Sequence, residues 1–231
     1  MRTVKDIFLL SLLPLFAFAA FSEELTYART RTDGLDIELS QVQLVAAVSD
    51  ENRIAYRFEL AEGKKLSCIE TQRTLRIRQL TPSRGTLYLF IPKAMVLENC
   101  SIRVNRADIR IEGLQAVHLL ATMNMGAATF KECRLKNAVI NLAQGTLTFD
   151  QTEIVRSCAF TLTGAVADIV FPSEEMNYHL DYVQNGGSLT IAGKEYTKTP
   201  GEYGNTKAKQ RIIFSSSMTA AVISFMENGK K

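Results

Sequence analysis

The sequence lacks most of the features from which a function is usually predicted. Its 231 residues include no tryptophan and only two histidines, and the formal net charge at pH 7 is +3. So small a net charge gives no reason to expect nucleic acid as a partner. Helical periodicity is scarce after residue 25, and no Gly-x-Ser-x-Gly elbow or Gly-Gly-x-Gly-x-Asp calcium repeat occurs. These absences exclude the commonest hydrolase and calcium-repeat patterns.

The N-terminal segment has the pattern of an export signal. Arg2 and Lys5 precede an uncharged apolar run over residues 7–21, which is interrupted by a proline and is too short to span a bilayer well. Small residues then recur in small-x-small spacing at 17–22, as at a cleavage site. We therefore predict a signal peptide over residues 1–22, with an uncleaved membrane anchor as the alternative.

The rest of the chain contains no apolar stretch long enough for a membrane helix, and no cysteine lies near the cleavage site. We expect no transmembrane segment after signal cleavage and no lipoprotein anchor. The mature protein is expected to be bacterial, exported, and located in the periplasm or at the cell surface.

Short segments that alternate apolar and polar residues dominate after residue 25. Turn residues separate these segments, which is typical of an all-β domain. The segments predicted as strands cover residues 35–39, 53–60, 74–80, 86–91, 101–104, 108–111, 188–191 and 221–225.

A weak repeat with a period of 19 runs through about residues 97–172. "MGAATF" at 125–130 is followed by "QGTLTF" at 144–149, and steps of 19 lead from Ala107 to Gly126, Gly145 and Gly164. Other inward columns are predicted from Ile102 through Ala121 and Ile140 to Ala159, and from Ile109 through Ala128 and Leu147 to Val166. A fixed period of this size indicates a solenoid in which each coil buries the apolar face of its neighbour.

The repeat fits a single-stranded β-helix with coils of about 19 residues, because equivalent positions then stack about 4.8 Å apart in columns. The change of parity between residues 102–104 and 107–111 predicts a corner at 105–106. The glycine column falls just after this corner. We expect glycine there because a larger side chain would collide with the neighbouring coil, and a requirement for positive φ is the alternative.

The segments "FIP" (90–92), "SIRVNRADIRIEGL" (101–114), "TMNMGAATF" (122–130), "LAQGTLTF" (142–149) and "NYHLDYVQNGGSLTIAGKEY" (177–196) carry a resemblance. The chain resembles the putative-adhesin β-helix family of bacterial envelope proteins, a family of unknown function with imperfect Gly-rich strand repeats. The resemblance covers about residues 25–227 and implies no catalytic residues. We expect one all-β domain over 23–231, with N-terminal cap strands at 23–80, regular coils at 81–172, and irregular coils with C-terminal closure at 173–231.

Few residues are candidates for chemistry. Cys68, Cys100, Cys133 and Cys158 are not one coil apart, so we expect buried free thiols, with disulfides as the alternative. His118 and His179 have no His or Cys at ligand spacing, and we expect both in exposed turns, with no metal and no cofactor.

An enzyme is not expected. Glu112 and Asp150 lie in one predicted column, but Lys131 stands between them, which favours a solvated surface ladder over a pair of catalytic carboxylates.

One charged feature suggests a binding site. Basic residues are dense between positions 71 and 110, where only Glu98 and Asp108 oppose them. Those expected to face solvent could form a patch for phosphate or carboxylate groups, the alternative being that they keep exposed strands soluble. The residues of this predicted patch are Arg76, Arg78, Arg103, Arg106 and Arg110.

The sequence thus favours an exported, non-catalytic envelope protein whose β-helix presents a surface for adhesion or scaffolding. Its partner could be an envelope glycan, an anionic lipid or another protein. Two alternatives stay open at this stage: a polysaccharide-active β-helix enzyme, and an exported β-barrel that carries a small apolar ligand.

Overall fold

The computed structural model describes residues 25–29, 31–60, 66–79, 81, 83–197 and 199–226. The predicted signal peptide lies outside them. The described chain is all-β, and its one short helical element is the 3-10 turn η1. The strands are β1 (Thr26–Tyr27), β2 (Gly34–Ser40), β3 (Val42–Ser49), β4 (Ala55–Leu60), β5 (Leu66–Thr71), β6 (Thr74–Gln79), β7 (Gly85–Pro92), β8 (Leu97–Asn105), β9 (Ile109–Glu112), β10 (Gln115–Lys131), β11 (Arg134–Asp150), β12 (Glu153–Phe171), β13 (Tyr178–Ile191), β14 (Lys194–Glu195), β15 (Gly201–Gly204) and β16 (Gln210–Phe225), with η1 at Glu175–Asn177.

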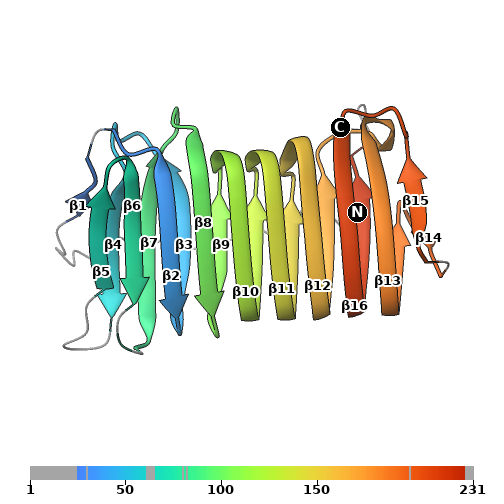
Figure 1. Cartoon of the computed structure of the whole chain (residues 1–231), viewed down its shortest axis with the longest axis horizontal. Helices are drawn as coiled ribbons and strands as arrows, with labels where there is room; N and C mark the ends of the chain where they lie inside the picture. Colours follow the sequence, from blue (N-terminus) through green and yellow to red (C-terminus); the bar gives the residue numbers. More distant parts are fainter. Residues whose placement is uncertain are drawn as a thin grey trace, which may run out of the picture.

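Each segment predicted as a strand overlaps an observed strand, whereas β1, β3, β5, β14 and β15 were not predicted. All the strands belong to one sheet, which runs from β1 at one end to β14 at the other without closing on itself (Figure 1). The ligand-carrier alternative would require a closed sheet. Among the described residues, no helix has the length and apolarity needed to cross a membrane.

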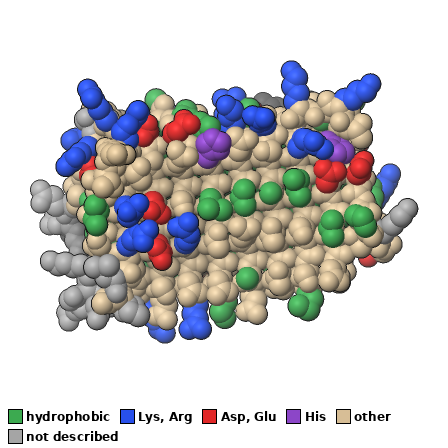
Figure 2. Space-filling model, in the orientation of Figure 1, with side chains coloured by type: hydrophobic (Ala, Val, Ile, Leu, Met, Phe, Trp, Pro, Cys, Tyr) green, Lys and Arg blue, Asp and Glu red, His purple; other side chains and the backbone are tan. Residues whose placement is uncertain are grey.

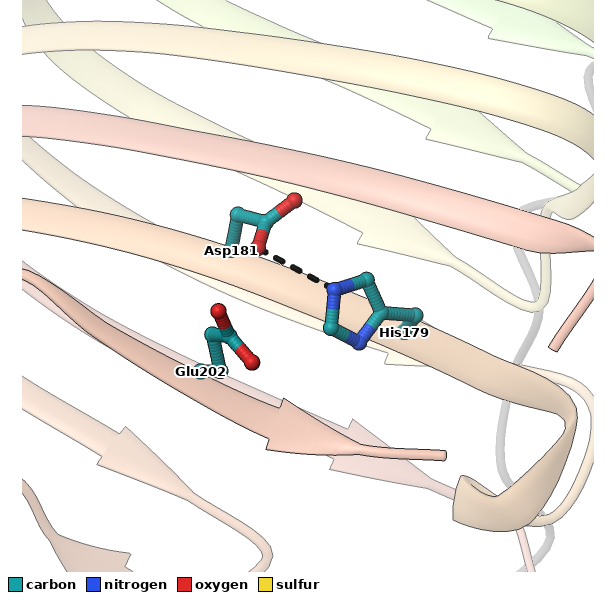
Figure 3. Close-up of side chains that lie close together, drawn as sticks. All are labelled: His179, Asp181 and Glu202. Carbon is teal, nitrogen blue, oxygen red and sulfur yellow. Dashed lines mark ion pairs between the residues drawn. The ribbon is translucent and has the colours of Figure 1, made fainter. Parts of the chain in front are cut away.

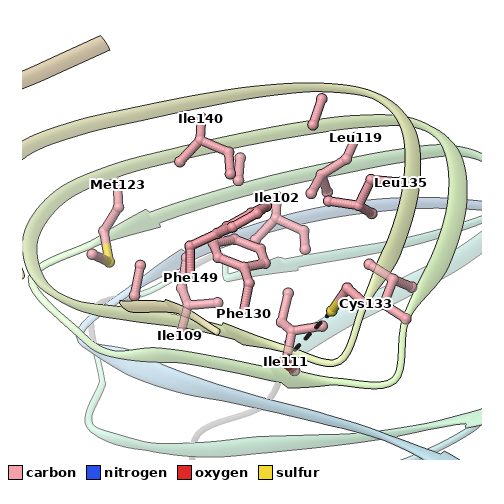
Figure 4. Packing of buried hydrophobic residues seen from close by; sticks show 14 of the residues in the cluster. Ile102, Ile109, Ile111, Leu119, Met123, Phe130, Cys133, Leu135, Ile140 and Phe149 are labelled. Carbon is pink, nitrogen blue, oxygen red and sulfur yellow. Dashed lines mark hydrogen bonds between the residues drawn. The ribbon is translucent and has the colours of Figure 1, made fainter. Parts of the chain in front are cut away.

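The 19-residue repeat is confirmed as strand register over the middle of the sheet. β10 and β11 pair in parallel, with Gln115 opposite Arg134 and Gly126 opposite Gly145. The first part of β10 pairs with β8 and its last part with β9, at the same offset in sequence. Each long strand therefore contributes two straight segments to the sheet, one on either side of a corner. We call such a strand, or a pair of consecutive strands such as β8 and β9 that takes its place, a level of the sheet. In Figure 4 the backbone bends around the buried side chains that these segments enclose.

The predicted columns are wrong by one residue after β11. The β11–β12 register shifts between Leu135 and Asn137, because β12 has an extra residue there, and from Asn137 onward each partner lies one position further along the chain. Gly145 therefore pairs with Ala165 rather than Gly164, and Ile140 pairs with Phe160 rather than Ala159. A bulge of this kind leaves the inward alternation intact but ends the fixed period.

The corner glycines are explained by both reasons considered above. A Cβ on Gly145 would overlap the carbonyl oxygen of Gly126, and one on Gly126 would overlap that of Ala107. The φ angles of Gly126 and Gly145 are also positive, at 144° and 143°. In the neighbouring column six residues turn the corner in the left-handed region, with φ between 50° and 67°. These residues are Gln41, Arg106, Met125, Gln144, Gly164 and Met218.

Inward side chains form a continuous apolar core between the two straight segments of each level (Figure 4). Phe149 is fully buried and lies 6.0 Å from Phe130, 5.3 Å from Phe160 and 6.0 Å from Phe171, measured between ring centroids. Aromatic pairs at such distances contribute about 0.5–1.5 kcal/mol each beyond the burial of their area. The rings hold adjacent levels in register from the inside.

The four cysteines are free thiols in the structure. Cys100, Cys133 and Cys158 are buried, whereas Cys68 is half-buried. Burial raises the pKa of the Cys100 thiol to about 12 and that of Cys133 to about 11. These side chains act as small apolar core residues.

At both ends of the sheet the spatial order departs from the chain order. β2 lies between β6 and β8, and β3 lies between β7 and β9, all in parallel. At the other end, β16 lies between β12 and β13. Residues 34–49, expected among the cap strands, thus occupy a level inside the sheet. Short antiparallel strands cover the outer levels, with β4 and β5 at one end and β14 and β15 at the other, where they protect edges that could otherwise pair with another chain.

Candidate binding surface

Three of the five predicted patch arginines meet on one face of the sheet. Arg76 and Arg78 lie on β6, Arg103 lies on β8, and the inserted strand β2 runs between them. β2 brings Asp36 opposite Arg76, and Glu38 opposite both Arg78 and Arg103. Glu98 and Asp108 were the acids expected to oppose the arginines, and Asp36 and Glu38 were not expected, because strand insertion cannot be deduced from the local pattern.

Asp36 is the centre of this arginine cluster, which we define as Asp36, Glu38, Arg76, Arg78 and Arg103. Its Oδ2 accepts hydrogen bonds from Arg76 Nε at 2.9 Å and Arg78 Nη2 at 3.3 Å, and its Oδ1 lies 3.6 Å from Arg103 Nη1. Arg78 Nη1 also pairs with Glu38 at 3.2 Å. The Asp36 side chain is 17% exposed, and the three arginine side chains are 42–48% exposed. Two carboxylates oppose three guanidinium groups, so a positive excess faces solvent.

The other two predicted patch residues lie elsewhere. Arg106 occupies the corner next to β8, where it lines a surface depression of about 510 Å³ together with Arg84 and Asp108. Arg110 is exposed on β9, which pairs with β3 and with the last part of β10 on the opposite face. The structure therefore brings Arg76, Arg78 and Arg103 together and separates Arg106 and Arg110 from them.

Beside the arginine cluster, the same face carries an uncharged field that the sequence analysis did not identify. It consists of outward side chains from β10, β11, β12 and β16, and parallel pairing places them in three rows across the strands. We call it the ladder face. Its rows are Leu120, Val139, Ala159 and Ile213; Thr122, Asn141, Thr161 and Ser215; and Asn124, Ala143, Thr163 and Ser217.

Each row of the ladder face has its own chemical character. The first row is apolar, and Val139 and Ile213 are 41% and 54% exposed. The second carries hydroxyl and amide groups, and the third mixes these with a methyl group. Figure 2 shows a row of apolar side chains crossing this face, with basic side chains gathered at its left end. Neighbouring strands lie about 4.8 Å apart, so the groups of a row repeat at that spacing.

The predicted carboxylate column is confirmed as a surface ladder. Glu112 is opposite Lys131, and Lys131 is opposite Asp150. Lys131 Nζ lies 3.2 Å from Glu112 and 3.4 Å from Glu132, and these carboxylates raise the pKa of the Lys131 ammonium group. Lys131 thus stands between Glu112 and Asp150 in the column and forms an ion pair with Glu112.

The expectation that both histidines lie in exposed turns is wrong. His118 is exposed but lies on β10, and His179 lies on β13 with only 4% of its surface exposed. His179 Nε2 is 3.1 Å from Asp181 Oδ1. The sequence offered one signal for this pair, because residues two apart on a strand point to the same face.

Comparison with known proteins finds similar solved structures at low sequence identity. No protein-family model and no curated protein matches the chain. A solved structure described as a putative cell adhesion protein from Clostridium sporogenes is similar, with a TM-score of 0.49 and 12% identity, over 87% of this chain and 97% of that one. A putative adhesin from Bacteroides fragilis has a TM-score of 0.37 and 10% identity, over 89% of this chain and 98% of that one. Identities this low do not transfer a function.

Proposed function

We propose that this chain is an exported, non-catalytic protein of the bacterial envelope that binds an extended partner through the ladder face. In this proposal the sheet is a β-solenoid whose coils follow the 19-residue repeat, and the regular rows are its binding surface. The parallel registers of β10, β11 and β12 support the solenoid. The export signal predicted for residues 1–22 supports the location.

One observation carries the proposal: the three rows of the ladder face contain no charged residue. An exposed surface normally mixes charges of both signs, and a strand face without them gives up solubility and protection against pairing. Hydroxyl and amide groups beside an apolar row suit a partner with alternating polar and apolar surface. An uncharged envelope glycan has that chemistry, and we propose it as the partner.

The arginine cluster adds a second element to the proposal. Arg76, Arg78 and Arg103 lie at the end of the ladder face and can pair with phosphate or carboxylate groups of an anionic partner. We retain Arg106 and Arg110 as separate candidate contacts, since they lie outside the cluster.

A matched pair of variants tests the ladder face. Asn141→Glu places a charge in its middle row, while Thr148→Glu places the same charge on the same strand, β11, facing the other side. Binding of the purified protein to immobilised uncharged envelope polysaccharides should fall at least about tenfold in Asn141→Glu, because a buried unpaired charge costs more than about 1.4 kcal/mol. Thr148→Glu should bind like the unaltered protein.

Equal binding by both variants, or no binding of any polysaccharide, would reject the ladder face as a glycan site. The arginines are tested on vesicles with and without anionic lipid, using Arg76→Gln, Arg78→Gln and Arg103→Gln together. Arg106→Gln and Arg110→Gln form separate arms. Vesicle binding that is unchanged by every arm would reject an anionic site.

A further inference from the structure

Three side chains with metal-binding groups meet at the C-terminal end of the sheet, on strands not yet assigned a role. β13 and β15 pair in an antiparallel manner, with Asp181 opposite Glu202 and His179 opposite Gly204. His179 and Asp181 are two residues apart on β13 and therefore share a face. Figure 3 shows the imidazole and both carboxylates on neighbouring strands, with the ion pair between His179 and Asp181.

The distances allow one cation to contact all three groups. One ligand atom each from His179, Asp181 and Glu202 can be chosen so that all lie within 4.8 Å of one another. His179 Nε2 and Asp181 Oδ1 are already 3.1 Å apart. Glu202 is exposed, so a change of its side-chain rotamer can close the remaining distance.

Within the described residues, cationic side chains balance the two carboxylates at this place only in part. Like charges directly opposite each other on paired strands are destabilising. Arg211 Nη2 lies 3.6 Å from Asp181 Oδ2, but no cationic side chain in the described part of the chain forms an ion pair with Glu202. A second cation near Glu202 would remove the repulsion between the two carboxylates.

The burial of His179 is a further feature of this group of side chains. His179 is 4% exposed, and its Nδ1 is buried without a hydrogen-bond partner among the described residues, while Nε2 faces the carboxylate of Asp181. Burying an imidazole with an unsatisfied nitrogen costs free energy. The imidazole is held in this buried position with Nε2, and not the unsatisfied Nδ1, directed at the carboxylate of Asp181, which is the orientation that a metal ligand needs here.

We propose that His179 Nε2, Asp181 and Glu202 bind a divalent transition-metal ion of the zinc class, with water completing its coordination. One imidazole and two carboxylates are ligands that Zn²⁺ accepts readily, whereas Mg²⁺ and Ca²⁺ prefer oxygen ligands alone. Such an ion would link β15 to β13 and fasten the antiparallel strands that cover this end of the sheet. The inference does not depend on glycan binding by the ladder face.

The test is zinc titration of the purified protein without a histidine tag, by calorimetry and by the shift in melting temperature. We expect one site per chain and a rise in melting temperature with Zn²⁺. Glu202→Gln and Asp181→Asn should each weaken binding at least about tenfold, since even a change to a group that only hydrogen-bonds a ligand costs about 10–100-fold in metal affinity. Both variants keep the side-chain size and remove one of two opposed charges, so each should fold without metal.

Two controls make the result specific. His118→Ala removes the exposed histidine of β10 and should leave zinc affinity unchanged. Cys68→Ser removes the half-buried thiol and should also leave it unchanged. Absence of zinc binding, equal affinity in the Glu202→Gln variant, or loss of binding in Cys68→Ser would each overturn the proposal, as would a preference for Ca²⁺ or Mg²⁺ over Zn²⁺.

Discussion

In the middle of the sheet, β10, β11 and β12 follow one another in chain order, whereas at each end a segment distant in the chain is inserted between neighbours. The middle levels pair at a short and nearly constant offset in sequence. At the N-terminal end Leu35 pairs with both Leu75 and Cys100, and at the C-terminal end Phe160 pairs with Phe214. The middle is thus built from local contacts, and the ends from contacts that close long loops.

The difference has consequences for folding and for function. Local pairing costs little loop-closure entropy, so the middle levels can form early, while the inserted strands must wait for their neighbours. The same insertions contribute residues to both charged clusters, the arginine cluster and the group of His179, Asp181 and Glu202. β2 carries Asp36 between the arginines of β6 and β8, and β16 carries Arg211 to Asp181. The uncharged rows of the ladder face lie on the levels between these two clusters.

Removing residues 210–231, and with them β16, should have the largest effect. Without β16, the long edge of β12 is unpaired and β13 loses its parallel partner. Ile212, Phe214 and Ile223 are fully buried, and each contributes about 1.5–3 kcal/mol by burial. The loss is of the size of a typical domain stability of about 5–15 kcal/mol, so we expect no cooperative thermal unfolding of the C-terminal half.

Circular dichroism and limited proteolysis measure this outcome. Ile213→Ala is the control, because Ile213 is 54% exposed on the same strand and its truncation should change stability by about 0.5 kcal/mol or less. A truncated chain that melts like the unaltered protein would show that the middle levels need no support from the inserted strand.

Gly145→Ala should have the next largest effect, since it acts on the middle levels. The added methyl group would overlap the backbone of Gly126, and the residue has a φ of 143°. Backbone must move to relieve the overlap, so we expect a loss of about 3 kcal/mol or more in chemical denaturation.

Gly193→Ala provides the matched comparison at the C-terminal end. Gly193 has a φ of 75°, but no atom lies within 4 Å of an added Cβ. Only the left-handed conformation is penalised there, at about 1–2 kcal/mol. Equal losses in the two variants would contradict the close approach of adjacent levels at the corner.

The strand pairing could be predicted from the sequence better in the middle of the sheet than at its ends. The predicted column is correct from Ile102 through Ala121 to Ile140, because these members are joined by regular 19-residue steps. The column through Gly164 fails because one extra residue in β12 shifts every later position, and a bulge leaves no compositional mark. Alternation predicted strands at both ends, but it carries no information on which strand is inserted where.

The candidate binding residues show the same limit, because residues that meet only through strand pairing could not be predicted from the sequence. The solvent-facing arginines of β6 were predicted from alternation with Leu75 and Ile77, yet their partner Asp36 lies 40 residues away from Arg76. The ladder face was missed because its rows run across strands, and its members are not adjacent in the chain. His179 and Asp181 are close in sequence, but Glu202 joins them only through the β13–β15 pairing.

The buried thiols of Cys100 on β8 and of Cys133 just before β11 predict a loss of stability at alkaline pH. Burial raises the pKa of Cys100 to about 12 and that of Cys133 to about 11, against 9.0 for an exposed thiol. Below pH 9 both thiols are protonated in the folded and unfolded chain. Above pH 9 the unfolded chain releases these protons and the folded chain retains them, so stability falls as pH rises towards 11–12.

By pH 10 the two thiols together should cost about 2–3 kcal/mol. Denaturation at pH 8 and pH 10 measures the loss. In a variant with Cys100→Ala and Cys133→Ala, the difference between the two pH values should shrink by about that amount, whatever the variant's own stability. An undiminished difference would assign the alkaline loss to other groups, such as the buried tyrosines.

Asp36→Asn should have the smallest effect and tests the N-terminal insertion. The change removes the carboxylate that accepts hydrogen bonds from Arg76 and Arg78 and lies 3.6 Å from Arg103. Because the arginines are nearly half exposed, solvent screens the pairs, and we expect a loss of about 1 kcal/mol at low salt. Glu38→Gln, at a 52% exposed side chain with one ion pair, should cost less. The gap between the two variants should narrow in 1 M salt, where the screening length is about 3 Å. If Asp36→Asn is neutral at low salt, or the gap persists at high salt, then the apolar side chains of β2 hold the inserted strand between β6 and β8, and the ion pairs do not contribute.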